Sequence, residues 1–234
     1  MIGPGDPVGI IAARFPFVVR VLEDARIDYY SAGSRPLHEA CATAHVSLDG
    51  IMARLKAEAE RPRSVVVDWM VAPLQQLMEH VVHGHHAFTR TLCGDIARNL
   101  EDAAQRHQDL TSLSELARLF TAFQADLVHH FDQEEAVAFP YVDALCQRFV
   151  PFSPFESVGA LANILEFEHE NVEDRLGELR ELTDGYMPPP GASASLRAAH
   201  AGLRTLERDL HEHLHLENNV VFHRARQLAQ ALGR

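Results

Sequence analysis

The sequence predicts an all-α protein, with an up-down-up-down four-helix bundle that follows a small helical N-terminal domain. Three observations support this prediction. No stretch alternates polar and apolar residues over a useful strand length, helix start and stop signals divide the chain after residue 73 into four long segments, and the connections between those segments are short. The 234 residues are 47% hydrophobic, which is enough to bury a core. We assign residues 1–60 to the N-terminal domain and 61–234 to the bundle.

The N-terminal domain is predicted to contain short helical segments separated by turns. Gly3-Pro4 and the stretch 31–36, which reads Ser-Ala-Gly-Ser-Arg-Pro, are typical turn sequences. The charged stretch 56–63 is interpreted as the linker to the bundle.

The first two long helices have recognisable boundaries. One is expected from Pro73, a favourable first helical residue, to about Arg106. The next is expected to begin at Ser112, which has capping-box spacing to Glu115. Pro140 is expected to kink or end that second helix, because proline lacks a backbone N–H.

The last two long helices are bounded in a similar way. The third is expected to start near 153–156, where Ser-Pro-Phe-Glu forms another capping box, and to end at 184–185 with a glycine as a C-cap. The loop 188–191 follows. The fourth helix is expected from Ser193 or Ser195 to about Gly233.

Composition excludes several classes of protein. The 33 acidic residues outnumber the 21 basic ones, for a net charge of −12, so a nucleic acid is a poor partner. The three cysteines, at 41, 93 and 146, form no CxxC motif and are odd in number, which argues against a disulfide scaffold. There is no apolar run of membrane-spanning length and no evident signal peptide, so we expect no membrane association and a cytoplasmic location.

The unusual feature is a content of 15 histidines in an acidic chain. At a rise of about 1.5 Å per residue, His86 lies about 30 Å and His130 about 27 Å from the turn that joins the first two long helices. The same arithmetic gives similar heights for His169 and His213. One histidine from each helix is therefore expected in one layer of the core.

Two of these histidines have a glutamate one helical turn later, Glu134 after His130 and Glu217 after His213. Residues i and i+4 share a helix face, so each pair directs both groups to one place. Buried carboxylates without a cation are costly. Four imidazoles and two carboxylates fit a pair of metal ions, and nitrogen-rich ligation suits Fe, Zn or Cu.

The other histidines are expected to serve different roles. His107 is placed near the turn between the first two long helices, and His83 could support a ligand. His80 and His85 are expected to point away from the metal, and solvated or satisfied polar roles are expected for His129, His211 and His215. A third His-x-x-x-Glu pair makes Glu173 either a supporting acceptor or an exposed residue, and the sequence leaves both open.

Several segments resemble the hemerythrin-like di-iron proteins that repair iron–sulfur clusters. In the bundle they are 130–140, which reads HFDQEEAVAFP, 167–170, FEHE, and 209–222, DLHEHLHLENNVVF. In the N-terminal domain they are 6–12, DPVGIIA, 15–16, FP, 20–23, RVLE, 27–29, IDY, and 37–41, LHEAC. The resemblance covers nearly the whole chain.

The resemblance implies two non-haem iron ions, joined by oxo or hydroxo and carboxylate bridges. The implied histidine ligands are His86, His130, His169 and His213, and the implied bridges are Glu134 and Glu217. It also implies a role in repairing clusters damaged by nitric oxide or oxidants, with damaged or apo iron–sulfur proteins and the gases NO or O₂ as partners. A homodimer is an expectation at the family level.

One departure concerns the N-terminal domain. Where the family has Cys-Cys-Gly-Gly, this chain has 30–33, Tyr-Ser-Ala-Gly, so the thiol chemistry of that segment is lost. Two alternatives to repair therefore stay open. One is a bundle that binds or senses O₂ or NO, and the other is an enzyme with weak NO or O₂ reductase activity.

Overall fold

The computed structural model describes residues 2–61, 67–107, 111–148 and 157–232, and these residues form helices joined by turns. The one bridge between extended segments in these ranges joins Pro7 and Pro36. The all-α prediction is therefore confirmed. No helix in the described ranges is long and apolar enough to cross a membrane.

Four long helical segments follow the N-terminal helices in the described part of the chain, and three of them contain a π-helical segment. Their elements are α5 (Leu74–His80), η2 (Val81–His86) and α6 (Ala87–Arg106); α7 (Thr111–Gln133), η3 (Glu134–Ala138) and α8 (Phe139–Cys146); α9 (Val158–Leu182); and α10 (Ala194–Leu216), η4 (Glu217–Val221) and α11 (Phe222–Ala231). The expected helix boundaries are met closely at Arg106 and at Ser193, whose Oγ accepts a hydrogen bond from the N–H of Leu196. The capping box expected at 153–156 lies outside the described residues.

Pro140 perturbs the second long helix without ending it. Residues 134–138 are π-helical and Pro140 lies in α8, which continues to Cys146. In a π turn the backbone hydrogen bonds run to the fifth residue back instead of the fourth. The extra residue makes room for the ring of Pro140, which has no N–H to donate, and the chain stays helical beyond the proline.

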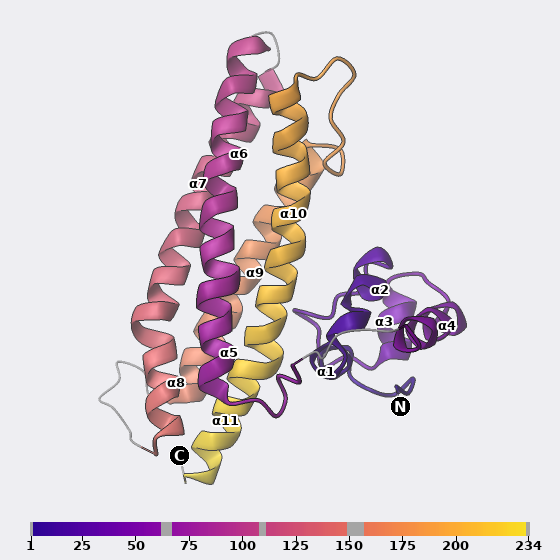
Figure 1. The fold of residues 1–234 in the computed structure, drawn as a ribbon, viewed down its shortest axis with the longest axis vertical. Helices are drawn as coiled ribbons and strands as arrows, with labels where there is room; N and C mark the ends of the chain where they lie inside the picture. The colour runs from indigo at the N-terminus through magenta and orange to yellow at the C-terminus, as the bar shows by residue number, and fades with distance from the viewer. Residues whose placement is uncertain (1, 62–66, 108–110, 149–156, 233–234) are drawn as a thin grey trace. The chain divides into compact units, whose positions relative to one another are not determined.

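Close contacts between Cα atoms divide the chain into two compact units, which we describe separately. The first unit contains 1–79, 142–162 and 211–234, and the second contains 80–141 and 163–210. The second unit is a four-helix bundle of α6, α7 and the adjoining parts of α9 and α10, which run in alternating directions (Figure 1). Its core is lined by the buried leucine and phenylalanine side chains of these helices.

The first unit contains the short N-terminal helices. They are α1 (Val8–Arg14), the 3₁₀ turn η1 (Pro16–Val18), α2 (Val19–Asp24), α3 (Leu37–Thr43) and α4 (Leu48–Ala59). Their apolar faces form one hydrophobic cluster centred on residues such as Ile11, Leu22 and Tyr29. The expected linker at 56–63 begins later than predicted, because Lys56 to Ala59 still belong to α4. The domain boundary at residue 60 remains a prediction.

Candidate metal centre

Three of the candidate ligands lie at the ends of π-helical segments. His86 is the last residue of η2, Glu134 is the first of η3, and Glu217 is the first of η4. A π turn holds one more residue than an α turn, which changes the direction of the side chains that follow, and such turns are frequent at functional sites. The sequence analysis did not predict these segments.

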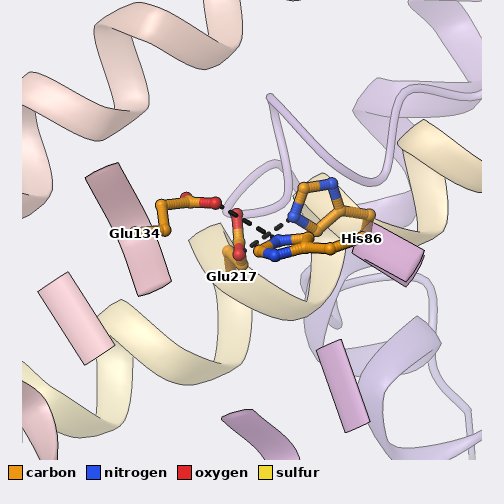
Figure 2. Close-up of side chains that lie close together, drawn as sticks. His86, Glu134 and Glu217 are labelled. Carbon is orange, nitrogen blue, oxygen red and sulfur yellow. Dashed lines mark ion pairs between the residues drawn. The ribbon is translucent and has the colours of Figure 1, made fainter. Parts of the chain in front are cut away.

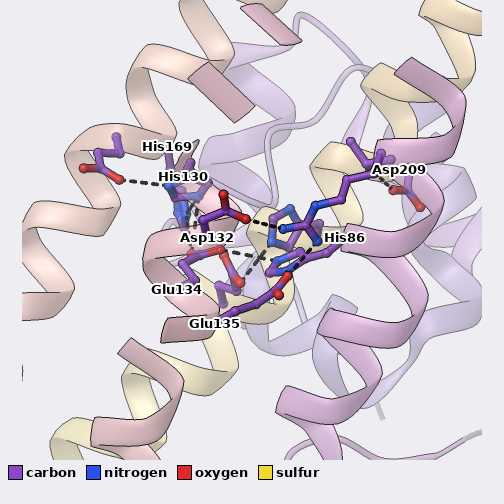
Figure 3. Close-up of polar contacts among 12 residues, drawn as sticks. His86, His130, Asp132, Glu134, Glu135, His169 and Asp209 are labelled. Atoms are coloured by element: carbon purple, nitrogen blue, oxygen red, sulfur yellow. Dashed lines mark hydrogen bonds and ion pairs between the residues drawn. The ribbon is translucent and has the colours of Figure 1, made fainter. Parts of the chain in front are cut away.

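In the second unit, Glu134 lies among three histidines. Its Oε1 is 3.3 Å from Nε2 of His130 and 3.5 Å from Nε2 of His169 (Figure 3). Its Oε2 is 3.3 Å from Nε2 of His86 (Figure 2). The Nε2 atoms of His130 and His169 are 3.1 Å apart. The two oxygens of one carboxylate therefore face different histidines, as a bridging ligand would.

In two of these histidines, Nδ1, the outer ring nitrogen that faces away from Glu134, is hydrogen-bonded to another carboxylate. Nδ1 of His86 donates to Glu135 Oε1 at 2.8 Å, and Nδ1 of His130 donates to Glu168 Oε2 at 2.8 Å. With the proton assigned to Nδ1, the Nε2 lone pair of each ring points inward. The sequence analysis missed Glu135 and Glu168, although each is adjacent in sequence to a predicted ligand.

The residues of this cluster fit a metal ion. Glu134 and His86 are fully buried, and His130 and His169 are at most 5% exposed. Inward lone pairs beside a buried carboxylate repel one another and are costly in a medium of low dielectric constant. The ligand atoms of His130, Glu134 and His169 lie within 4.8 Å of one another, so a shared cation could bind all three.

The remaining two candidate ligands lie together in the first unit. Nε2 of His213 is 2.9 Å from Oε1 of Glu217, and both side chains are fully buried. The i,i+4 spacing brings them together although Glu217 starts a π segment. This pair repeats the relationship between His130 and Glu134.

The outer carboxylates have pKa values that reflect these contacts. The hydrogen bond from His130 lowers the pKa of Glu168. Burial alone would raise the pKa of Glu135, but the hydrogen bonds from Arg90 and His86 lower it overall. Both groups are therefore carboxylates at neutral pH, which is the form that accepts a hydrogen bond from an imidazole N–H.

The other histidines lie where the sequence suggested, with one exception. His107 is the C-cap of α6, and its Nε2 accepts the N–H of Ser193 at 3.0 Å. His85 pairs with Asp209 at 3.0 Å, and His129 is exposed. His83 is also exposed, which gives no support for a role beside a ligand.

His211 and His215 have polar partners in the first unit. Nδ1 of His211 is 3.0 Å from Glu23, and Nδ1 of His215 is 3.2 Å from the amide nitrogen of Asn219. Burial lowers the pKa of His215 to about 4, so this imidazole is neutral near pH 7. Glu173 is half-buried.

Tyr29 and Tyr30, at the segment where the resemblance implies a cysteine pair, pack against α10 and η4. The ring of Tyr30 stacks on His211 with centroids 4.0 Å apart, and Tyr29 donates from its hydroxyl to Glu23 at 2.9 Å. The amide of Asn219 donates to the carbonyl oxygens of Tyr29 at 3.2 Å and Tyr30 at 3.0 Å. The aromatic ring of Tyr30 thus packs at the position where the resemblance led us to expect a thiol.

Comparison with known proteins supports the same family. The hemerythrin HHE cation binding domain matches residues 77–225. Iron-sulfur cluster repair protein YtfE of Pectobacterium carotovorum subsp. carotovorum is 28% identical over 223 residues, covering 93% of this chain and 95% of that protein. The proteins of the same name from Citrobacter koseri, at 27%, and Salmonella schwarzengrund, at 28%, each cover 94% of this chain and are themselves covered to 96%. With its helical bundle and its cluster of histidines around a buried glutamate, this chain belongs to the hemerythrin HHE cation-binding family.

Proposed function

We propose that this chain is a non-haem di-iron protein that helps to repair iron–sulfur clusters damaged by nitrosative or oxidative stress, by supplying iron to damaged or apo proteins. The observation that carries the proposal is the fully buried Glu134, whose two oxygens face different histidines. The name of the full-length relatives supports the repair role.

We assign the ligands as His86, His130, His169 and His213, with Glu134 and Glu217 as bridges. The geometry around Glu134 supports its bridging role, and the buried pair of His213 and Glu217 supports a matching contribution from α10 and η4. The family match at 77–225 contains all six residues. A nitrogen-rich set with two carboxylates suits iron.

Each part of this chain has a distinct task in the proposed mechanism. Glu135 and Glu168 hold the Nδ1 protons of His86 and His130, which keeps their Nε2 lone pairs directed inward. Burial of Glu134 and His86 excludes water from the interior of the site. When bound, iron would supply a redox-active cation that can interact with NO or O₂ and can be passed to a cluster.

Metal analysis of the purified protein is the direct test of the centre. We expect two iron ions per chain and an optical spectrum of a bridged di-iron centre in aerobically purified protein. Zinc or copper in place of iron, or a single ion per chain, would contradict the assignment.

Substitution of ligands provides a matched prediction. His130→Leu and Glu217→Leu are expected to lower the iron content well below two per chain, because each removes a buried metal-binding group. His107→Leu is the control and should keep both ions, because its imidazole binds the N–H of Ser193 instead. Two ions per chain in His130→Leu would refute the ligand set, provided that circular dichroism shows the same helix content.

A second candidate function is the binding or sensing of NO or O₂ without repair. Tyr30 and Ser31 favour it, because the thiols of the family's cysteine pair are absent from this segment. The two functions are separated by mixing the iron-loaded protein with an apo iron–sulfur protein, and separately with NO. Restored clusters support repair, whereas reversible gas binding without restored clusters supports sensing.

A further inference from the structure

The candidate ligands of the second unit have two unlike surroundings. His86 is fully buried, and its ring stacks on Phe131 with centroids 4.2 Å apart and on Phe139 at 6.0 Å. Its Nδ1 is held by Glu135 (Figure 3). An imidazole fixed on its faces and at its outer nitrogen has little freedom to turn away from a metal ion.

The carboxylate behind His86 is itself held in place. Arg90 donates to Glu135 at 2.7 Å and to Asp132 at 2.9 Å, and its guanidinium lies over the ring of Phe131 at 5.4 Å. These contacts tie α6 to α7 and η3. The group made by Arg90, Glu135 and Asp132 therefore acts as a clamp on His86.

His130 lies at the wall of a cavity, in contrast to His86 with its clamp. The cavity, of about 460 Å³, lies between α7 and α9 and is lined by Phe123, Asp126, His129, His130, Glu168, Asn171, Val172, Asp174, Arg175 and Glu178. Water occupies roughly 30 Å³ per molecule in the liquid, so the cavity has room for a hydrated cation. Glu168, which holds Nδ1 of His130, is itself 41% exposed.

The charge of the cavity wall favours cations. Four of the lining residues are acidic, namely Asp126, Glu168, Asp174 and Glu178. Arg175 supplies a positive charge but lies 2.9 Å from Glu178, which neutralises it in part. A negatively charged recess raises the local concentration of cations.

We propose that the two metal positions retain iron unequally: the ion on His130 and His169 exchanges through the acidic cavity, and the ion on His86 is retained by the clamp. Exchange needs a route for water and a ligand that can move aside. On the His130 side the cavity provides the route, and Glu168, which holds His130, lies in the cavity wall where water can replace its contact. On the His86 side the corresponding carboxylate, Glu135, is held by Arg90. This inference rests on the proposed di-iron function and adds which ion is supplied.

The experiment measures iron release from full-length protein loaded with two ferrous ions per chain under anaerobic conditions. An excess of a coloured ferrous chelator is added, and the absorbance of the complex is followed with time. We expect two phases of equal size, one ion per chain each, with rates that differ at least tenfold. A single phase that releases both ions together would overturn the inference.

Two sets of variants assign the phases. Asp126→Asn with Asp174→Asn should slow the fast phase at least threefold, because these exposed carboxylates line the cavity and touch no proposed ligand. Glu101→Gln with Glu115→Gln removes the same charge from exposed residues outside the cavity lining and should leave both rates unchanged. Equal effects of the two double variants would mean that net charge, not the cavity, controls release.

The clamp is tested by Glu135→Gln, which keeps the shape of the side chain but weakens its hold on His86 and Arg90. We expect the slow phase to accelerate at least fivefold while the fast phase keeps its rate. Acceleration of both phases alike would refute the assignment of the slow ion to His86.

The proposed function and the unequal retention of iron fail on different results. Protein that does not bind two iron ions contradicts the di-iron centre. Protein that restores clusters but releases both ions together contradicts only unequal retention.

Discussion

At the scale of single residues, the candidate centre depends on which nitrogen of each imidazole carries the proton. Glu135 and Glu168 bind the outer nitrogens of His86 and His130, and this leaves the inner nitrogens as ligands. Sequence spacing could not predict these carboxylates, because each lies on a different helical segment from the histidine that it binds. Glu135 reaches His86 from another helix, 49 positions along the chain.

A small residue at position 33 is required by the packing of Asn219. A Cβ atom built on Gly33 would overlap the amide group of Asn219, which also holds the carbonyls of Tyr29 and Tyr30. Overpacking typically costs about 1–3 kcal/mol. We therefore expect Gly33→Ala to lower the free energy of unfolding by about that amount in urea denaturation.

Gly5→Ala is the matched control for this substitution. A Cβ atom there meets no atom within 4 Å, so its effect should stay within about 0.5 kcal/mol. Equal stability of the Gly33 and Gly5 variants would show that the loop yields to the added methyl group.

At the scale of secondary-structure elements, the boundaries of the helices were largely predictable and their π segments were not. Ser193 and Arg106 mark helix ends by capping and composition, which act within one turn of the chain. The π segments insert one residue in the middle of a helix, at His86, Glu134 and Glu217. Pro140 marks η3 in the sequence, whereas η2 and η4 contain no proline.

The N-terminal cap of α10 can be tested alone. Ser193→Ala removes the hydroxyl that accepts the N–H of Leu196, and such a loss typically costs about 1 kcal/mol. We expect a correspondingly lower urea midpoint with an unchanged slope. Ser193→Asp, which can also cap, should restore most of the stability, and failure of that rescue would argue against capping as the cause.

At the scale of the whole molecule, the stability of the fold should depend on pH through buried histidines. His200 is 5% exposed, and burial lowers its pKa although a backbone hydrogen bond with Tyr186 opposes the shift. The unfolded chain has an ordinary histidine pKa of about 6.5 and therefore binds more protons below that pH. The His200 contribution to stability is present above pH 6.5 and is lost as the pH falls toward the lower pKa of the folded state.

Replacement of His200 should reduce this acid sensitivity. We expect His200→Leu to lose less stability than the parent protein between pH 7.5 and pH 5, as measured by urea midpoints at equal metal content. His83→Leu, which changes an exposed histidine, is the control and should follow the parent protein. Parallel pH curves for the His200 variant and the parent would exclude His200 as a source of the acid sensitivity.

Several properties of this protein were determined by the sequence alone. Helical periodicity and capping residues act locally, so the all-α fold and most helix ends could be predicted. The pairs of His130 with Glu134 and of His213 with Glu217 could also be predicted, since a helix places residues i and i+4 on one face. Matching heights along the helices predicted that His86 and His169 would lie in the layer of His130, and both face Glu134 in the structure.

Only the tertiary structure decided how these residues are held. The sequence left open which histidines share a carboxylate oxygen, and the structure places His130 and His169 at one oxygen of Glu134 and His86 at the other. It also placed the clamp beside His86 and the acidic cavity beside His130. These features come from side chains that meet across helices, and no local pattern encodes a contact whose partners are set by the packing of the whole bundle.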